Sequence, residues 1–278
     1  MFQRSLPVLL WSLGHRRGRP MFQEIRAFLK RRVIHTPINP LYIARNGIRR
    51  RLMQARPYLR GCLLDIGCGH KPYADMLQVQ RYVGIEMPTT LSKSTVVDVH
   101  ASALQLPFSA ESFDSVLSTE VLEHVAEPKL LFSEAARVLK PGGYLVLSTP
   151  QTWGLHEVPY DFYRYTSYGL RYLAETTGFQ VLDVWPTCGL WAMIGQRVSS
   201  FLAHRYARDR WLPLQGAWLL ICAFVQIISL GLDWLYNGEG DTLDNVIVAQ
   251  KVESGRDVTA GNSTWLGPSS RWHSPLTS

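Results

Sequence analysis

The sequence has few cysteines, and their arrangement gives no basis for cross-links or metal binding. Its 278 residues include four cysteines, with no Cys-x-x-Cys pair and no cluster with histidine at metal-ligand spacing. We therefore expect neither a disulfide framework nor a metal site. This cysteine usage fits the reducing cytoplasm best.

A cleavable leader and a series of long apolar runs are also lacking. With 46% hydrophobic residues, the chain is too polar for a protein with many membrane spans. Residues 1–14 contain a short apolar run, but Pro7 interrupts it and no small-x-small cleavage site follows. These features predict a cytoplasmic protein, with peripheral attachment to the inner face of a membrane as an alternative.

Acidic residues are almost absent from the first sixty positions. Residues 1–60 hold 14 Lys+Arg against the single acid Glu24, a net charge of +13, whereas the remainder has 15 basic and 21 acidic residues, a net charge of −6. Such a basic helical arm attracts an anionic partner, either a phospholipid surface or a nucleic acid. The alternative is a set of solvated faces on amphipathic helices, because apolar residues separate the basic clusters.

From residue 61 onward, short β-branched runs alternate with helical stretches, which is typical of a parallel sheet with crossover helices. The pattern predicts a Rossmann-like α/β fold with a seven-stranded, mostly parallel sheet and helices on both faces. The core covers 61–185, the final strand covers 245–252, and 253–278 form a disordered tail rich in Ser, Gly, Thr and Pro. The expected strands are 62–66, 81–85, 95–98, 114–118, 144–149, 179–184 and 246–252, and the expected helices are 72–78, 120–139 and 166–177.

Residues 186–244 form an insertion that a minimal fold of this kind does not need, and a connection of this length usually has a function. Within it, 215–232 is nearly all apolar, and Gln226, Ser229 and Asp233 share one face. Such a helix lies in a lipid interface, forms a buried lid, contacts a second copy or spans a membrane. The sequence leaves the oligomeric state open, and residues 1–60 and 215–235 are the candidate membrane contacts.

A glycine turn follows the first expected strand of the core. Gly67 and Gly69 come directly after the strand that contains Asp65, and glycine allows a ligand to approach the backbone closely there. Glu86 ends the next strand, where a carboxylate can accept hydrogen bonds from ribose hydroxyls. The dinucleotide fingerprint requires a third glycine, and Pro72 stands in its place, which disfavours an NAD oxidoreductase.

In this order, the motifs resemble those of the class I S-adenosylmethionine (SAM)-dependent methyltransferases, specifically the type 11 family. The matching segments are Leu64–Gly69, Gly84–Glu86, Leu106–Phe108, Ser112–Val116, Glu120–Val125 and Arg137–Gly143. The resemblance implies that SAM is the cofactor and that a set of nine residues binds it. These are Asp65, Gly67, Cys68 and Gly69 at the methionine part, Glu86 at the ribose, Ser102 and Ala103 at the adenine, and Thr119 and Glu120 at the sulfonium.

The chain departs from the family pattern at the adenine contact, where the family commonly has an acid and this chain has Ser102. A serine hydroxyl still accepts a hydrogen bond, so the departure predicts weaker anchoring of the adenine. Cys68 is also interpreted as a small filler, Asp114 as a turn residue, and Glu123 and His124 as structural residues.

The segment after the fifth core strand carries the candidate catalytic residues. His156, Tyr160 and Asp161 lie in a stretch dense in polar and aromatic side chains, with His156 as the candidate general base. The alternative is that His156 only hydrogen-bonds Asp161.

The predicted function is in-line transfer of a methyl group to a small-molecule, lipid or glycan acceptor. A catalytically silent SAM-binding regulatory protein and a nucleic-acid methyltransferase are the alternatives. A nucleic acid is not the expected partner, because the chain lacks the Asn/Asp-Pro-Pro-Tyr type of motif.

Overall fold

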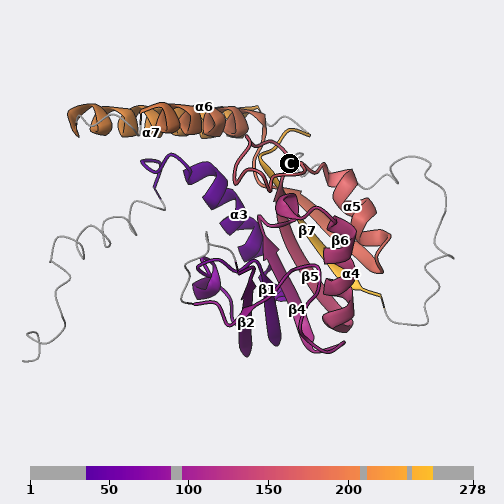
Figure 1. Ribbon diagram of the computed structural model, residues 1–278. Helices are drawn as coiled ribbons and strands as arrows, with labels where there is room; N and C mark the ends of the chain where they lie inside the picture. Colours follow the sequence, from indigo (N-terminus) through magenta and orange to yellow (C-terminus); the bar gives the residue numbers. More distant parts are fainter. Residues whose placement is uncertain (1–35, 89–95, 207–211, 237–239, 253–278) are drawn as a thin grey trace, which may run out of the picture.

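In the computed structural model, the described residues 36–88, 96–206, 212–236 and 240–252 form one seven-stranded sheet with helices on both faces (Figure 1). The strand order is β3-β2-β1-β4-β5-β7-β6, and β7 runs antiparallel to both of its neighbours. The strands are β1 (Cys62–Ile66), β2 (Arg81–Glu86), β3 (Val99–His100), β4 (Phe113–Thr119), β5 (Leu139–Pro150), β6 (Phe179–Pro186) and β7 (Asp244–Lys251). The expected Rossmann-like sheet is confirmed.

Alternating side chains on the central strands bury the two faces of the sheet separately. Leu64 and Val116 pack on the face covered by helices α4 (Pro128–Val138) and α5 (Ser167–Glu175). Leu63 and Leu117 pack on the opposite face, against helix α3 (Tyr42–Ala55). This period of two is the pattern expected of strands that are buried on both sides.

Helix α3 lies within the segment expected to form a basic arm, and it packs against the sheet. Its residues Ile48, Leu52 and Ala55 are buried in the same cluster as β1 and β4 residues, while Arg51 donates a hydrogen bond of 2.8 Å to the carbonyl of Pro186. The first part of the expected basic arm, residues 1–35, and the expected disordered tail, residues 253–278, lie outside the described residues.

The expected helix over 120–139 is wrong at its start. Helix α4 begins at Pro128, and Glu120 has a φ of 55°, which is incompatible with a right-handed helix. Proline favours the first helical turn and disfavours a helical conformation in the residue before it, and Glu127, with a φ of −115° and a ψ of 72°, lies outside the helical region. Residues 120–127 therefore form a loop, with a single 3₁₀ turn, η3, at Leu122–His124.

Two smaller elements also differ from the sequence prediction. The expected helix 72–78 is reduced to the 3₁₀ turn η2 (Ala74–Met76), because the backbone is extended at Leu77 so that the chain can enter β2. A further 3₁₀ turn, η1, covers Arg56–Tyr58. The strand expected at 95–98 begins at Val99, which pairs with Ile85, while the Asp98 carboxylate accepts a hydrogen bond of 2.7 Å from the Gly84 amide.

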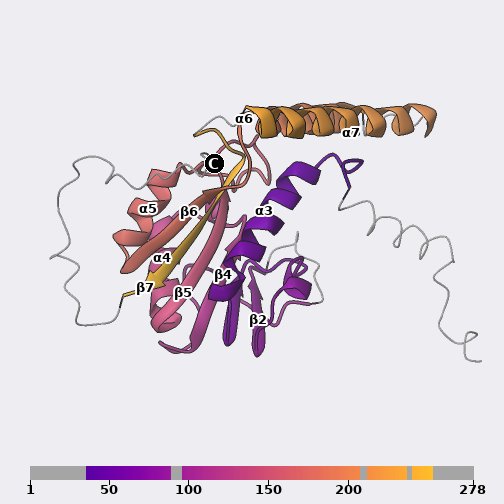
Figure 2. The same ribbon diagram turned by 180° about the vertical axis from the view of Figure 1, so that it is seen from behind.

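The insertion forms a helical hairpin of α6 (Leu190–Tyr206) and α7 (Leu212–Leu235), which extends beyond the sheet in both views (Figures 1 and 2). Gly195 lies so close to α7 that a Cβ atom there would be 2.1 Å from the Ser229 hydroxyl oxygen. Gln226 is buried, and its side-chain amide donates 2.9 Å hydrogen bonds to the carbonyls of Pro37 and Asn39. The polar side of α7 therefore faces inward.

Outward-facing apolar side chains cover the hairpin, and most of α7 is not buried against the rest of the described chain. Among the described helices, α7 is long and apolar enough to cross a membrane, over Ala217–Leu235. Only 22% of this window is buried. The exposed apolar residues include Phe201, Leu220, Phe224, Ile227, Ile228 and Trp234.

Candidate cofactor and acceptor site

The predicted glycine turn lies where β1 ends, and its backbone conformation requires glycine. Gly67 has a φ of 71° and Gly69 a φ of 49°, values that residues with a Cβ rarely adopt. The amides of Gly67 and Cys68 both donate to the Ile85 carbonyl, at 3.0 Å and 2.9 Å, which ties the turn to β2. A Cβ on Gly69 would meet no atom of the described protein within 4 Å, so this side of the turn is open.

Asp65 carries a buried carboxylate with one unused oxygen. The Tyr82 hydroxyl donates to Oδ2, whereas Oδ1 has no hydrogen-bond partner among the described residues. Burial raises the pKa of Asp65 to about 7. The amides of the glycine turn donate to the Ile85 carbonyl and not to the Asp65 carboxylate. The expectation that Asp65 orients the turn therefore stays a prediction. A cationic ligand at this end of β1 would stabilise the ionised carboxylate.

Glu86 faces the glycine turn from the end of β2. Its carboxylate accepts hydrogen bonds from the Gly69 amide at 2.9 Å and from its neighbour's amide, Met87, at 3.1 Å. These two bonds hold the carboxylate beside the open side of the turn, and each oxygen retains a lone pair for a hydroxyl. The geometry is the one expected of a ribose-binding acid.

The segment at the predicted adenine contact forms a tight turn. The Ser102 hydroxyl oxygen accepts a hydrogen bond of 3.2 Å from the Leu104 amide, and Ser102 and Ala103 are both half-buried. Arg137 on α4 donates to the carbonyls of Leu106 and Phe108, at 2.9 Å and 2.7 Å, and so fixes the end of this segment. Ser102 therefore keeps one lone pair and its O–H group for a ligand.

Two carboxyl groups, the half-buried Glu120 and the buried Asp244, gather where β4, β5 and β7 meet, next to Thr119 at the end of β4. The Glu120 carboxylate accepts a 2.7 Å hydrogen bond from the Ser148 hydroxyl, and burial raises the pKa of Glu120 to about 7. Asp244 is also buried, and its burial together with the negative charge of Glu120 raises its pKa well above the usual range. Because like charges repel in a poorly solvated site, this cluster favours a cationic ligand.

The loop after β5 holds the three candidate catalytic residues, and the structure gives them different surroundings. Arg164 donates two hydrogen bonds to Asp161, of 2.7 Å and 2.8 Å, and thereby lowers the pKa of that carboxyl. The backbone amide of His156 donates to Asp161 at 2.9 Å, whereas the Tyr160 side chain is exposed. Asp161 is thus the anchor of the loop, and the imidazole of His156 is its candidate reactive group.

Two residues that the sequence suggested were structural lie beside His156. Glu123 Oε1 is 3.9 Å from His156 Nε2 and 3.8 Å from His124 Nε2, and the two imidazole centroids are 4.7 Å apart. The only sequence signal for this arrangement is Pro128, which ends the loop that carries Glu123 and His124. Cys68, by contrast, is buried as expected of a filler, and its burial raises the thiol pKa to about 12.

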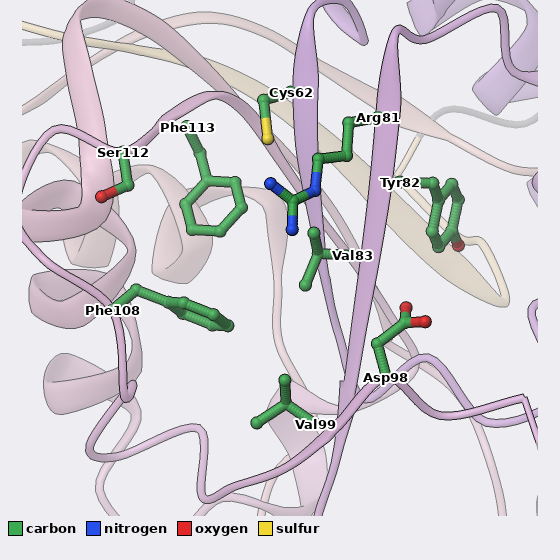
Figure 3. Close-up of a pocket in the computed structure, with 9 residues that line it drawn as sticks. All are labelled: Cys62, Arg81, Tyr82, Val83, Asp98, Val99, Phe108, Ser112 and Phe113. Atoms are coloured by element: carbon green, nitrogen blue, oxygen red, sulfur yellow. The ribbon is translucent and has the colours of Figure 1, made fainter.

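A cavity of about 390 Å³ lies at the opposite end of the strands, and it contains none of the predicted site residues (Figure 3). It opens beside Cys62, Arg81 and Phe113, the first residues of β1, β2 and β4. The cofactor features described above occur where β1, β2 and β4 end. The cavity is therefore separate from the candidate site.

Comparison with known proteins identifies the same segment. Residues 64–147 match the family model described as a methyltransferase domain. A malonyl-[acyl-carrier protein] O-methyltransferase of Herminiimonas arsenicoxydans is 36% identical over 121 residues, which cover 40% of this chain and 46% of the relative. A ubiquinone biosynthesis O-methyltransferase of Rhizobium etli is 34% identical over 107 residues, which cover 34% of this chain and 43% of the relative. The chain thus spans less than half the length of these two relatives.

Among solved structures, phosphoethanolamine N-methyltransferase 2 of Haemonchus contortus, in complex with S-adenosyl-L-methionine, has a TM-score of 0.47 and 19% identity. The match covers 80% of this chain and 59% of that chain.

The sheet, the glycine turn and Glu86 define a class I SAM-dependent methyltransferase domain. Residues 64–147 belong to the type 11 methyltransferase family, and SAM is the cofactor of this domain. The residues present fit that cofactor: the side of Gly69 is open, Glu86 lies beside it, and Asp65 has an unpartnered buried oxygen.

Proposed function

We propose that the whole protein transfers the methyl group of SAM to an acceptor held between the ends of β4 and β5 and the loop at 151–166. The observation that carries this proposal is the open glycine turn with Glu86 hydrogen-bonded to its Gly69 amide, within the matched methyltransferase segment. The loop with His156 follows β5 directly, so a ligand at the turn and a ligand at the loop would be neighbours.

Most of the catalytic contribution of the protein would be alignment and exclusion of water. Bound SAM supplies a methyl group on a sulfonium, which an acceptor nucleophile displaces in line. Glu86 and the turn would fix the ribose and the amino-acid part, and the acids at Glu120 and Asp244 would stabilise positive charge nearby. The Asp161–Arg164 pair keeps the acceptor loop in place, with His156 Nε2 3.9 Å from Glu123 in the turn that follows β4.

The hairpin of α6 and α7 indicates where the acceptor comes from. Its buried residues are polar or small, such as Gln196, Ser199 and Gln226, and its exposed residues are apolar, such as Phe224 and Ile228. This inside-out distribution is typical of helices that pack against each other within lipid, where small residues and polar groups mediate contact between helices. We propose that the hairpin inserts into an anionic phospholipid bilayer. The basic residues in the segment 1–60 would strengthen this binding by electrostatic attraction to the lipid headgroups.

The hairpin is also connected to the acceptor loop. The Arg197 guanidinium lies over the Trp153 ring, 5.6 Å from its centroid, and a Cβ on Gly154 would be 3.2 Å from an Arg197 nitrogen. Membrane seating would therefore bring the loop close to the bilayer surface. This placement supports a lipid or lipid-linked acceptor and a location at the inner face of the membrane.

The activity is tested by incubating the full chain with methyl-labelled SAM and a membrane extract. We expect label in the organic phase with the wild type and, at a SAM concentration below the dissociation constant of the variant, much less with Glu86→Ala. SAM binding by the wild type without any labelled product from membrane or soluble extracts would support the silent regulatory alternative instead.

The lipid contact is tested by sedimentation with vesicles that contain phosphatidylglycerol. We expect the wild type to pellet with these vesicles and the double variant Phe224→Asp, Ile228→Asp to remain in the supernatant. Leu130→Asp is the matched control, because Leu130 is 47% exposed on α4 and Ile228 48% exposed on α7. Equal pelleting of wild type and double variant contradicts the proposal, as does a wild-type dimer that the double variant breaks without any vesicle binding.

A further inference from the structure

Three metal-binding side chains converge between η3 and the acceptor loop. The ligand atoms of Glu123, His124 and His156 all lie within 4.8 Å of one another. Glu123 Oε1 is 3.8 Å from His124 Nε2 and 3.9 Å from His156 Nε2. Folding brings His156 to the adjacent pair Glu123 and His124, which lies more than thirty positions earlier in the sequence, so spacing along the chain gave no sign of the cluster.

Hydrogen bonds determine which nitrogen of each imidazole carries the proton. His124 Nδ1 is 2.7 Å from the Tyr160 carbonyl oxygen, and His156 Nδ1 is 3.1 Å from the Gly154 carbonyl oxygen. A carbonyl oxygen only accepts, so Nδ1 is the protonated nitrogen in both neutral rings. Each Nε2 then presents a lone pair, which is the arrangement that orients histidines toward a metal.

The carboxylate supplies the third lone pair. Glu123 is fully buried, and its Oε2 accepts a 3.2 Å hydrogen bond from the Thr149 hydroxyl. Its Oε1, the oxygen that faces both histidines, has no hydrogen-bond partner among the described residues. A buried acceptor without a donor is unfavourable, and a cation shared by the three facing acceptors would satisfy it.

We propose that Glu123, His124 and His156 bind a divalent first-row transition-metal ion. Two imidazoles and one carboxylate suit such ions, whereas magnesium and calcium prefer oxygen ligands alone. Ligands held at about 2.1 Å in a tetrahedral site are about 3.4 Å apart, so Glu123 Oε1 and each histidine Nε2 would approach each other by about 0.5 Å on binding. The Glu157 carboxylate, 3.8 Å from His124 Nε2, is an available additional ligand.

The place of the cluster suggests what the ion does, and this part rests on the proposed methyl transfer. Glu123 is tied to the acceptor loop by its carbonyl, which accepts a 2.9 Å hydrogen bond from the Phe162 amide. An acceptor hydroxyl bound to the ion would lose its proton to water more readily. The ion would then orient and activate an oxygen acceptor, and His156 would act as a ligand instead of a general base.

Cobalt(II) titration of the full-length protein, stripped of metal with a chelator, tests the site in the absence of SAM. We expect one Co²⁺ per chain, with visible absorption bands that Zn²⁺ abolishes by competition. Glu123→Gln, which keeps the shape of the side chain, and His156→Ala should each weaken binding at least tenfold. His204→Ala is the matched control, because His204 is an exposed histidine on α6, and it should bind like the wild type.

Thermal unfolding with and without Zn²⁺ separates loss of ligands from loss of fold. We expect Zn²⁺ to raise the Tm of the wild type and of His204→Ala and to leave Glu123→Gln unchanged, while the variants retain wild-type affinity for SAM. Equal Co²⁺ affinity of the wild type and Glu123→Gln, or no binding by the wild type, would overturn the proposal. Metal binding without methyl transfer would leave the site standing and refute only the proposed function.

Discussion

Two glycines of the cofactor turn allow a matched test of how the turn is built. Both have positive φ, 71° at Gly67 and 49° at Gly69, so alanine is strained at either position by about 1 kcal/mol. Only Gly67 is also enclosed: its Cβ would lie 2.2 Å from Val121 Cγ2, whereas a Cβ at Gly69 meets nothing within 4 Å. Overpacking of this kind adds about 1–3 kcal/mol.

We therefore expect Gly69→Ala to lower the free energy of unfolding by about 1 kcal/mol and Gly67→Ala by about 3 kcal/mol. Urea denaturation of the purified proteins without cofactor measures both values, provided that the slopes with urea agree. Equal losses in the two variants would refute the reasoning, because they would mean that Val121 does not enclose the turn.

Three further predictions concern the carboxylates of Glu86, Glu134 and Asp65. Glu86→Ala should weaken SAM binding at least tenfold in calorimetric titration, since the ribose loses its acceptor, whereas Glu175→Ala, at an exposed position on α5, should have no effect; similar losses would contradict the assignment. Arg137 lowers the pKa of Glu134, so the wild type should exceed Glu134→Gln in stability at pH 7 and lose that advantage as the pH falls below about 4.5; a constant difference in Tm would count against the pair. Burial raises the pKa of Asp65 from 3.8 to about 7, so the folded cofactor-free protein should lose stability as the pH rises between these values, and Asp65→Asn should lack this part of the slope in Tm against pH.

The sheet was predictable because its strands carry their own signal. The apolar runs around Leu63 and Leu145 are buried on both faces, and a strand of this type is apolar along its whole length. Helix α5 was predictable from Thr166, whose hydroxyl oxygen accepts from the Gly169 amide at 3.1 Å as an N-cap. Such local signals need no knowledge of the tertiary structure.

The helix boundary before α4 and the inward face of the hairpin depended on longer-range contacts. The sequence around Glu120 and Glu123 has helical periodicity, although these residues lie in a loop, and Pro128 is the sequence signal for the end of that loop. This loop carries the carboxylates of the site. Gln226 looked like an interruption of an apolar helix, but its partners are the carbonyls of Pro37 and Asn39, which are distant in the sequence. Pairings of this kind are set by the fold as a whole.

The most direct test of the account is isothermal titration of the purified, folded chain with SAM and, separately, with NAD. The account predicts one SAM per chain, no binding of NAD, and loss of SAM binding in Gly69→Arg, whose side chain would extend into the open side of the turn. A folded wild-type protein that does not bind SAM, or that binds NAD in its place, would contradict the central claim.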